Sequence, residues 1–143
     1  MGNRAVITTK NKDIGIYLHW NGGYDSVRAF LLYCKIKRFQ TLEEGGWANL
    51  AYVIGNYFKN IEEVEINTLN NLDCNNYDNG LYITEKWDIV GREYHTGPEQ
   101  NEYRLDRMLY DIDEAQPIPK QLGREKILDY LEKRKMTNDK TEI

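Results

Sequence analysis

Residues 14–39, IGIYLHWNGGYDSVRAFLLYCKIKRF, decide the fold because strand alternation gives way to helical periodicity within a few residues. In the first part every second residue is apolar, which is typical of a strand with one buried face. We therefore predict a strand over residues 14–20. The face toward the core is expected to carry Ile14, Ile16, Leu18 and Trp20, and the opposite face Gly15, Tyr17 and His19.

The second part predicts a helix that ends near residue 39. Its apolar side chains recur at the spacing of one helix face. These side chains are Val27, Phe30, Leu31 and Cys34. Asp25 or Ser26 is expected to cap the start of this helix, because short polar side chains can accept hydrogen bonds from the first N–H groups.

A glycine pair, Gly22 and Gly23, joins the predicted strand to the predicted helix. We expect these glycines to supply positive φ angles for the turn. A phosphate-binding loop is the weaker alternative, because the segment lacks the three spaced glycines of a dinucleotide fingerprint and the Gly-Lys-Ser/Thr ending of a P-loop. The corner can still present polar side chains and helix-start N–H groups to a ligand.

The rest of the chain contains similar elements on both sides of this corner. Strands are predicted over residues 4–9, 64–69, 80–84 and 87–94, and helices over residues 47–58, 102–115 and 124–135. The predicted fold class is α+β, a mainly antiparallel sheet of about five strands with about four helices packed on it. We expect a single domain over residues 1–135 and a frayed C-terminal tail over residues 136–143.

Composition restricts the class of protein. The chain has 143 residues, of which 41% are hydrophobic and 29% are charged, so one globular domain is expected. No apolar run approaches the roughly 18–20 residues of a membrane span, and the N-terminus lacks the layout of a secretory signal, so we expect a soluble protein in the bacterial cytoplasm. The net charge of −4 argues against nonspecific nucleic-acid binding.

Aromatic side chains suggest a contact surface, because tyrosine and tryptophan are enriched where proteins meet their partners. The chain has 11 tyrosines and three tryptophans. Tyr17, His19 and Tyr82, together with Arg4 or Arg92, are predicted to project from one side of the sheet, where such groups could stack a base or a nucleotide. The alternative is that a terminal helix or a second subunit covers this face, so a homo-oligomer is possible.

The candidate residues for ligand or partner binding come from this face and from the corner. They are Tyr17, His19, Trp20, Asn21, Asp25, Tyr82 and Arg92. The helix predicted over residues 102–115 is rich in Asp and Glu, and an acidic face of this kind is either solvated or meets a basic partner.

Catalytic and metal-binding patterns are not evident. The two histidines, His19 and His95, have no ligand-like neighbour at a recognised spacing, so no metal, no cofactor and no catalytic residue is predicted. The best enzyme hypothesis is Cys74 acting as a nucleophile with one of these histidines. Cys34 lies on the apolar face of a predicted helix, so we expect a buried free thiol rather than a disulfide.

The N-terminal part of the chain resembles small uncharacterised proteins of Firmicutes and of their phages or mobile elements. The resemblance rests on MGNRAVI at the start, on IYLHWNGG and on the YDSVRAF helix, and it covers chiefly residues 1–58. It implies an accessory protein that binds and inhibits a host defence protein in the manner of an anti-CRISPR inhibitor. The alternative is a sponge that sequesters a small nucleotide immune signal, and the third hypothesis is a small hydrolase that uses Cys74 with a histidine.

Overall fold

The computed structural model describes residues 3–59, 63–99 and 101–141, and for residues 136–141 only the backbone. Five strands form one sheet in the order β3-β2-β1-β4-β5. The strands are β1 (Ala5–Thr9), β2 (Ile14–Leu18), β3 (Val64–Thr68), β4 (Leu81–Glu85) and β5 (Asp88–Glu93). Only the central pair, β1 and β4, is parallel, so the sheet is mixed and mostly antiparallel.

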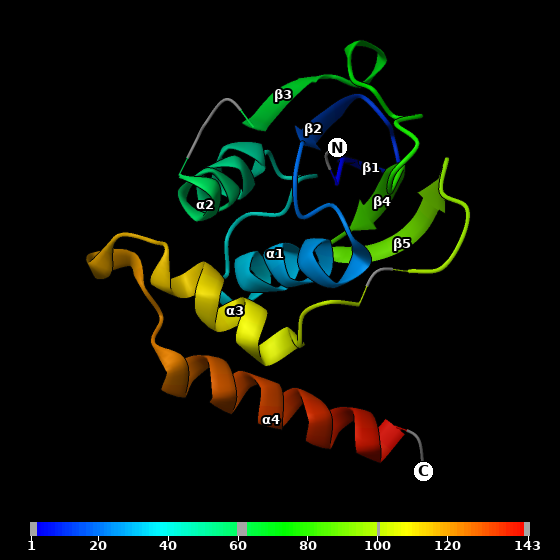
Figure 1. The fold of residues 1–143 in the computed structure, drawn as a ribbon. Coiled ribbons are helices and arrows are strands. Elements are labelled where there is room, and N and C mark those ends of the chain that lie inside the picture. Colours follow the sequence, from blue (N-terminus) through cyan, green and yellow to red (C-terminus); the bar gives the residue numbers. More distant parts are fainter. Residues whose placement is uncertain (1–2, 60–62, 100, 142–143) are drawn as a thin grey trace.

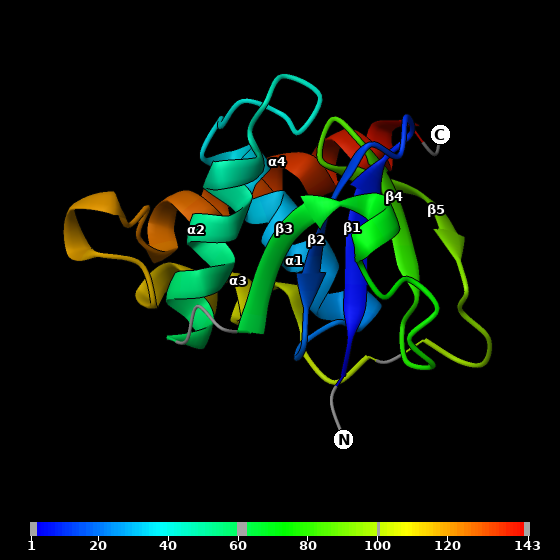
Figure 2. The same cartoon turned by 90° about the horizontal axis from the view of Figure 1, so that it is seen from above.

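Four α-helices accompany the sheet in the described part of the chain, which confirms the predicted α+β class. They are α1 (Tyr24–Ile36), α2 (Trp47–Phe58), α3 (Leu105–Glu114) and α4 (Arg124–Thr141), with the short 3-10 helices η2 (Leu69–Asn71) and η3 (Ile118–Lys120). Helix α1 lies across one face of the sheet, α2 lies beside the β3 edge, and α3 separates α1 from α4 (Figures 1 and 2).

The main core lies between the sheet and the helices. It is built from fully buried apolar side chains such as Ile7 and Ile16 of the sheet, Phe30 of α1, Ile54 of α2 and Leu109 of α3. Each side chain of this size removed from water contributes roughly 1.5–3 kcal/mol before entropy costs. Burial of this apolar face holds the three helices on the sheet.

A smaller core covers the opposite face of the sheet. Val6 and Leu81 are buried there against Leu72, which follows η2. Tyr17 and Cys74 are partly buried against the same cluster. This face is therefore covered in part by the segment after β3, and not by a terminal helix.

Three predicted side-chain positions on the sheet are wrong. Tyr82 is fully buried on the helix side, because it aligns with Ile7, which in turn aligns with Ile16. Trp20 is 39% exposed rather than in the core, since β2 ends at Leu18 and the alternation ends with it. Ile14, the first residue of β2, is 37% exposed and is not in the core either. Ile16 and Leu18 are fully buried, as predicted.

The corner between β2 and α1 also differs from the prediction. Asn21, and not a glycine of the pair, adopts the left-handed conformation, with φ of 55°. Gly23 is the N-cap residue of α1, with φ of −67°, and no side chain caps the helix, so the predicted cap by Asp25 or Ser26 is wrong. Both Asn and Gly tolerate positive φ, and in this corner the residue that adopts positive φ is Asn21.

Helix α4 is longer than predicted, because its backbone is helical through Thr141 rather than to residue 135. The fraying of residues 136–143 stays a prediction. Among the described helices, none combines the length and the apolar character that crossing a membrane would require.

Candidate functional site

The predicted site residues lie in three separate places. Tyr17 and His19 share the face opposite the helices, and their side chains form a hydrogen bond of 2.9 Å between Oη and Nδ1. The edge of the Trp20 ring lies against His19, with 5.0 Å between ring centroids. Arg4 lies on the same face, because it precedes Ala5, which aligns with Leu18.

Carboxylates surround the only arginine of this aromatic group. Arg4 Nε donates to Asp78 at 2.7 Å, and Arg4 Nη1 lies 3.8 Å from Asp73. Burial raises the pKa of Asp78, but the hydrogen bonds from Arg4 outweigh that effect, so the pKa is lowered. The positive charge of Arg4 is thus engaged within the protein and offers little to a phosphate.

Tyr82 and Arg92 form a second group on the helix side of the sheet. The Arg92 guanidinium lies 3.9 Å from the centroid of the Tyr82 ring, and the Tyr82 hydroxyl donates to the Gly22 carbonyl at 2.6 Å. Arg92 also donates to Asn79 O at 2.8 Å and to Glu99 Oε1 at 2.6 Å. Burial raises the pKa of Tyr82. These contacts fasten β4 and β5 to the corner, so this group is structural.

Asn21 and Asp25 form the third group, at the start of α1. Asp25 Oδ2 accepts hydrogen bonds from the backbone N–H groups of Glu102 and Tyr103, at 2.7 and 2.8 Å. Asn21 Nδ2 donates to Ser26 Oγ at 3.3 Å. Both side chains therefore hold local structure, and in the described part of the chain no hydrogen bond joins either of them to Tyr17 or His19.

In the described part of the chain no hydrogen bond joins Cys74 to His19 or His95, although Cys74 packs against the same cluster as Tyr17, which bonds to His19. Burial raises the pKa of Cys34 and of Cys74, so neither thiol is activated as a thiolate. His95 Nδ1 lies 3.4 Å from Glu99, whose Oε1 also accepts a hydrogen bond from Arg92. Within residues 3–59, 63–99 and 101–141, no cluster of His, Cys, Asp and Glu could hold a metal ion.

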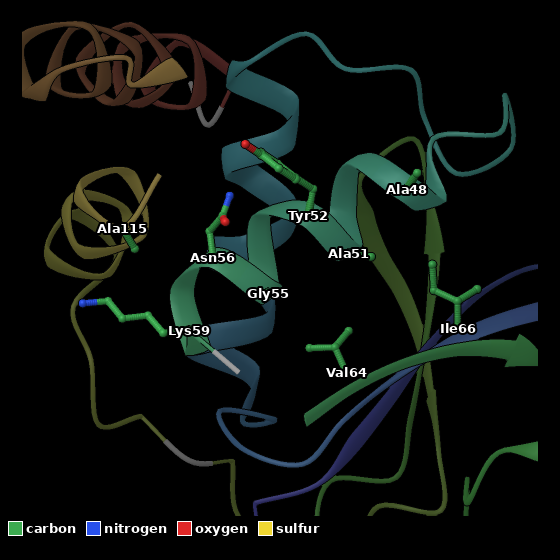
Figure 3. Close-up of a pocket in the computed structure, with 9 residues that line it drawn as sticks. All are labelled: Ala48, Ala51, Tyr52, Gly55, Asn56, Lys59, Val64, Ile66 and Ala115. Carbon is green, nitrogen blue, oxygen red and sulfur yellow. The ribbon is translucent and has the colours of Figure 1, made fainter. Parts of the chain in front are cut away.

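A hollow lies between α2 and β3, and Figure 3 shows it. Its volume is about 860 Å³. The side chains that line it are mostly small or apolar. They are Ala48, Ala51, Tyr52, Gly55, Asn56 and Lys59 of α2 and its C-cap, Val64 and Ile66 of β3, and Ala115. We call this hollow the α2–β3 groove.

The α2–β3 groove is apolar because of the sequence of α2. The helix, WANLAYVIGNYF, has no ionisable group other than tyrosine hydroxyls, although 29% of the chain is charged. Its buried face is formed by Leu50, Val53 and Ile54, and Tyr52 on another face is 49% exposed. Ile66 of β3 points toward the helix side of the sheet and is nevertheless 42% exposed. The helix thus leaves part of the apolar sheet face uncovered.

None of the predicted site residues lines the α2–β3 groove. Two signals in the sequence could have indicated it: a helix without Asp, Glu, Lys or Arg, and a glycine at position 55 inside that helix. A wholly uncharged amphipathic helix is usually read as buried on most sides. Part of α2 is exposed because the helix lies beside an edge strand, and the sequence pattern does not predict this position.

The fold and the groove together define a class, an α+β domain with a mostly apolar hollow beside an edge strand of its sheet. No protein-family model matches the chain, and comparisons with curated proteins and with solved structures found no similar protein.

Proposed function

We propose that this protein is a non-enzymatic binding protein that inhibits a bacterial defence component by occupying it through the α2–β3 groove. The observation that carries the proposal is an apolar hollow of about 860 Å³ whose lining has a single charged group, Lys59. Protein-binding surfaces are depleted of charge at their centre and rich in aromatic side chains. Exposed Tyr52 and Ile66 provide that chemistry here.

The setting of the proposal comes from the resemblance of residues 1–58 to proteins of Firmicutes phages and mobile elements. Short accessory proteins of such elements often bind and block a host protein, and an anti-CRISPR-like inhibitor is the concrete form of this idea. Burial raises the pKa of both cysteine thiols, which gives the third hypothesis, a hydrolase that uses Cys74, less support.

The nucleotide-sponge alternative receives less support from the geometry. A phosphate site needs several unengaged donors or cations, and Arg4 already binds Asp78. The α2–β3 groove has one cation and predominantly apolar walls.

The experiment is to measure binding and inhibition with purified defence effectors, CRISPR nucleases first. Ala48→Arg places a charge in the α2–β3 groove at an exposed helix position, where the fold tolerates it. Val90→Arg makes a similar change at a 50% exposed residue of β5, the opposite edge strand.

We expect inhibition to weaken at least about tenfold in Ala48→Arg, since each tenfold corresponds to about 1.4 kcal/mol, and to persist in Val90→Arg. No association with any effector would contradict the proposed function. Equal inhibition by both variants would contradict the role of the groove.

A further inference from the structure

We infer that the α2–β3 groove binds one extended peptide segment of the partner as an additional strand beside β3, with an acidic residue near Lys59. This inference rests on the proposed function, because it specifies how the groove is occupied. It follows from the backbone of the edge strand, from the side chains beside it and from the one charge at the groove.

The backbone of β3 alternates between its neighbour and open space. His19 N donates to Glu63 O at 3.1 Å, and Leu69 N donates to Asp13 O at 3.0 Å. In an antiparallel pair every second residue bonds to the neighbouring strand, so residues 63, 65, 67 and 69 face β2. Val64, Ile66 and Thr68 therefore direct their N–H and C=O groups away from β2, toward the outer edge of the sheet.

One end of this edge is closed by side chains. Thr68 N donates to Asn67 Oδ1 at 2.8 Å. Asn71 Nδ2 donates to Asn67 Oδ1 at 3.2 Å and to Thr68 Oγ1 at 2.9 Å. Proteins often protect edge strands in such ways. Among the described residues no side chain closes the edge at Val64 and Ile66 in this way, and this is the part of the edge that lines the α2–β3 groove.

The groove has room for the side chains of an added strand. Alternate side chains of that strand would point toward α2, where the helix surface is formed by Ala48, Ala51 and Gly55. A Cβ atom at Gly55 would have no described neighbour within 4 Å, apart from the helix's own backbone and the adjoining residues. A glycine inside a helix is destabilising relative to alanine, and neither backbone conformation nor internal packing at Gly55 requires it. Close approach of a bound chain would account for it.

Charge defines the preferred sequence of the occupant. Lys59 is the single charged residue that lines the α2–β3 groove, and it forms no ion pair with any residue described in residues 3–59, 63–99 or 101–141. Figure 3 shows its side chain at the end of α2, on the Ala115 side of the groove. An acidic side chain at this end would complement Lys59, and uncharged side chains suit the rest.

A single segment fits this edge better than a second copy of the chain. Helix α2 lies alongside β3 at the margin of the molecule (Figures 1 and 2). A symmetric β3-to-β3 pairing would bring the second copy's own α2 into the space next to the first. An isolated strand has no such helix.

The test uses extended peptides of about six residues, the usual length of a strand, selected against the purified protein from a random display library. In an added strand alternate N–H groups face β3, and the others face solvent. We therefore expect N-methylation of one alternate set in the selected peptide to weaken binding at least about tenfold, while methylation of the other set leaves affinity within about twofold.

Two further measurements locate the site and its charge. The backbone amides of Val64 and Ile66 should exchange more slowly when the peptide is bound. Replacing the acidic residue of the peptide by its amide should weaken binding to the native protein, but it should not weaken binding to the Lys59→Asn variant. Asn is chosen because Lys59 has φ of 58° and Asn tolerates that conformation.

The inference would be overturned if the two methylation patterns had equal effects on binding. It would also be overturned if the peptide slowed amide exchange at residues other than Val64 and Ile66, or if no peptide could be selected. Peptide-free dimerisation that slows exchange at Ile66 would also overturn it, in favour of a second copy. If Ala48→Arg abolishes inhibition of an effector and the peptide results are negative, the groove binds its partner by another mode, and the proposed function remains.

Discussion

Gly22 lies where the corner after β2 passes against the chain that leads into β1. Its N–H donates to Asn3 O at 2.8 Å, and its carbonyl accepts from the Tyr82 hydroxyl at 2.6 Å. A Cβ atom there would lie 2.5 Å from Asn3 O and 2.8 Å from Ala5 Cβ. Glycine is needed at this position for close approach of two chain segments, and not for an unusual φ.

Replacing this glycine should therefore destabilise the fold. We expect Gly22→Ala to lower the free energy of unfolding by about 1–3 kcal/mol, because backbone must shift to admit the methyl group. Urea denaturation measures this change. A Gly22→Ala protein as stable as the native one would show that the corner can relax without cost.

Asp78 gives the protein a defined dependence on acid. Hydrogen bonds from Arg4 lower the pKa of Asp78 in the folded state below its ordinary value of 3.8, although burial opposes them. A lowered pKa contributes stability that is fully present above the unfolded value and is lost as the pH falls through the folded one.

We therefore expect Asp78→Asn to lose less stability than the native protein on acidification from about pH 5 to about pH 2. The measurement is the free energy of unfolding at each pH for both proteins. If the free energy of unfolding changed with pH in the same way for both proteins, the pKa of Asp78 would not be lowered in the folded state.

At the scale of the element, α2 contains a glycine that lowers the stability of the helix. Gly55 lies inside the helix, and a Cβ atom there would find open space. We expect Gly55→Ala to raise the free energy of unfolding by about 0.5–1 kcal/mol, the opposite sign from Gly22→Ala.

The same methyl group enters the α2–β3 groove, so we also expect Gly55→Ala to weaken binding of the selected peptide. Thermal unfolding and peptide titration on one sample measure both effects. If the variant gained stability and bound the peptide with full affinity, close approach of the peptide to α2 would not explain the glycine at position 55.

A buried carboxylate joins three helices into one layer. Asp113 of α3 is 3% exposed and accepts hydrogen bonds from the Tyr33 hydroxyl of α1 at 2.5 Å and from the N–H groups of Leu122 and Gly123, just before α4, at 2.7 and 2.9 Å. Hydrogen bonds to charged groups contribute about 1.5–3 kcal/mol each, and buried donors left without a partner add a penalty.

We expect Asp113→Ala to destabilise the protein by roughly 3 kcal/mol or more, and Tyr33→Phe, which removes one of the three donors, by a smaller amount. Chemical denaturation of the two variants gives the comparison. A larger loss in Tyr33→Phe would mean that the carboxylate is not the hub of this layer.

At the scale of the whole molecule, the periodicity of the sequence predicts every strand and α-helix of the described chain, and the largest error in a boundary is the end of α4, which lies at Thr141 and not at residue 135. The position of Tyr82 is not predictable in this way, because its face depends on parallel pairing of β1 with β4, more than 70 residues away along the chain. The corner is misassigned in detail because Asn21 and glycine both satisfy positive φ. The α2–β3 groove exists because of how α2 packs beside β3, and local sequence patterns do not predict the separation of these two elements.

The most direct measurement for the whole account is amide hydrogen exchange of the protein alone and in complex with a defence effector that the binding experiments identify as its proposed target. The outward N–H groups of Val64 and Ile66 have no neighbouring strand on that side and should exchange quickly in the free protein. We predict that the effector slows exchange at these two amides and leaves Val90, in the opposite edge strand β5, unchanged. Unaltered exchange at Val64 and Ile66 in a fully formed inhibitory complex would contradict strand addition at the α2–β3 groove.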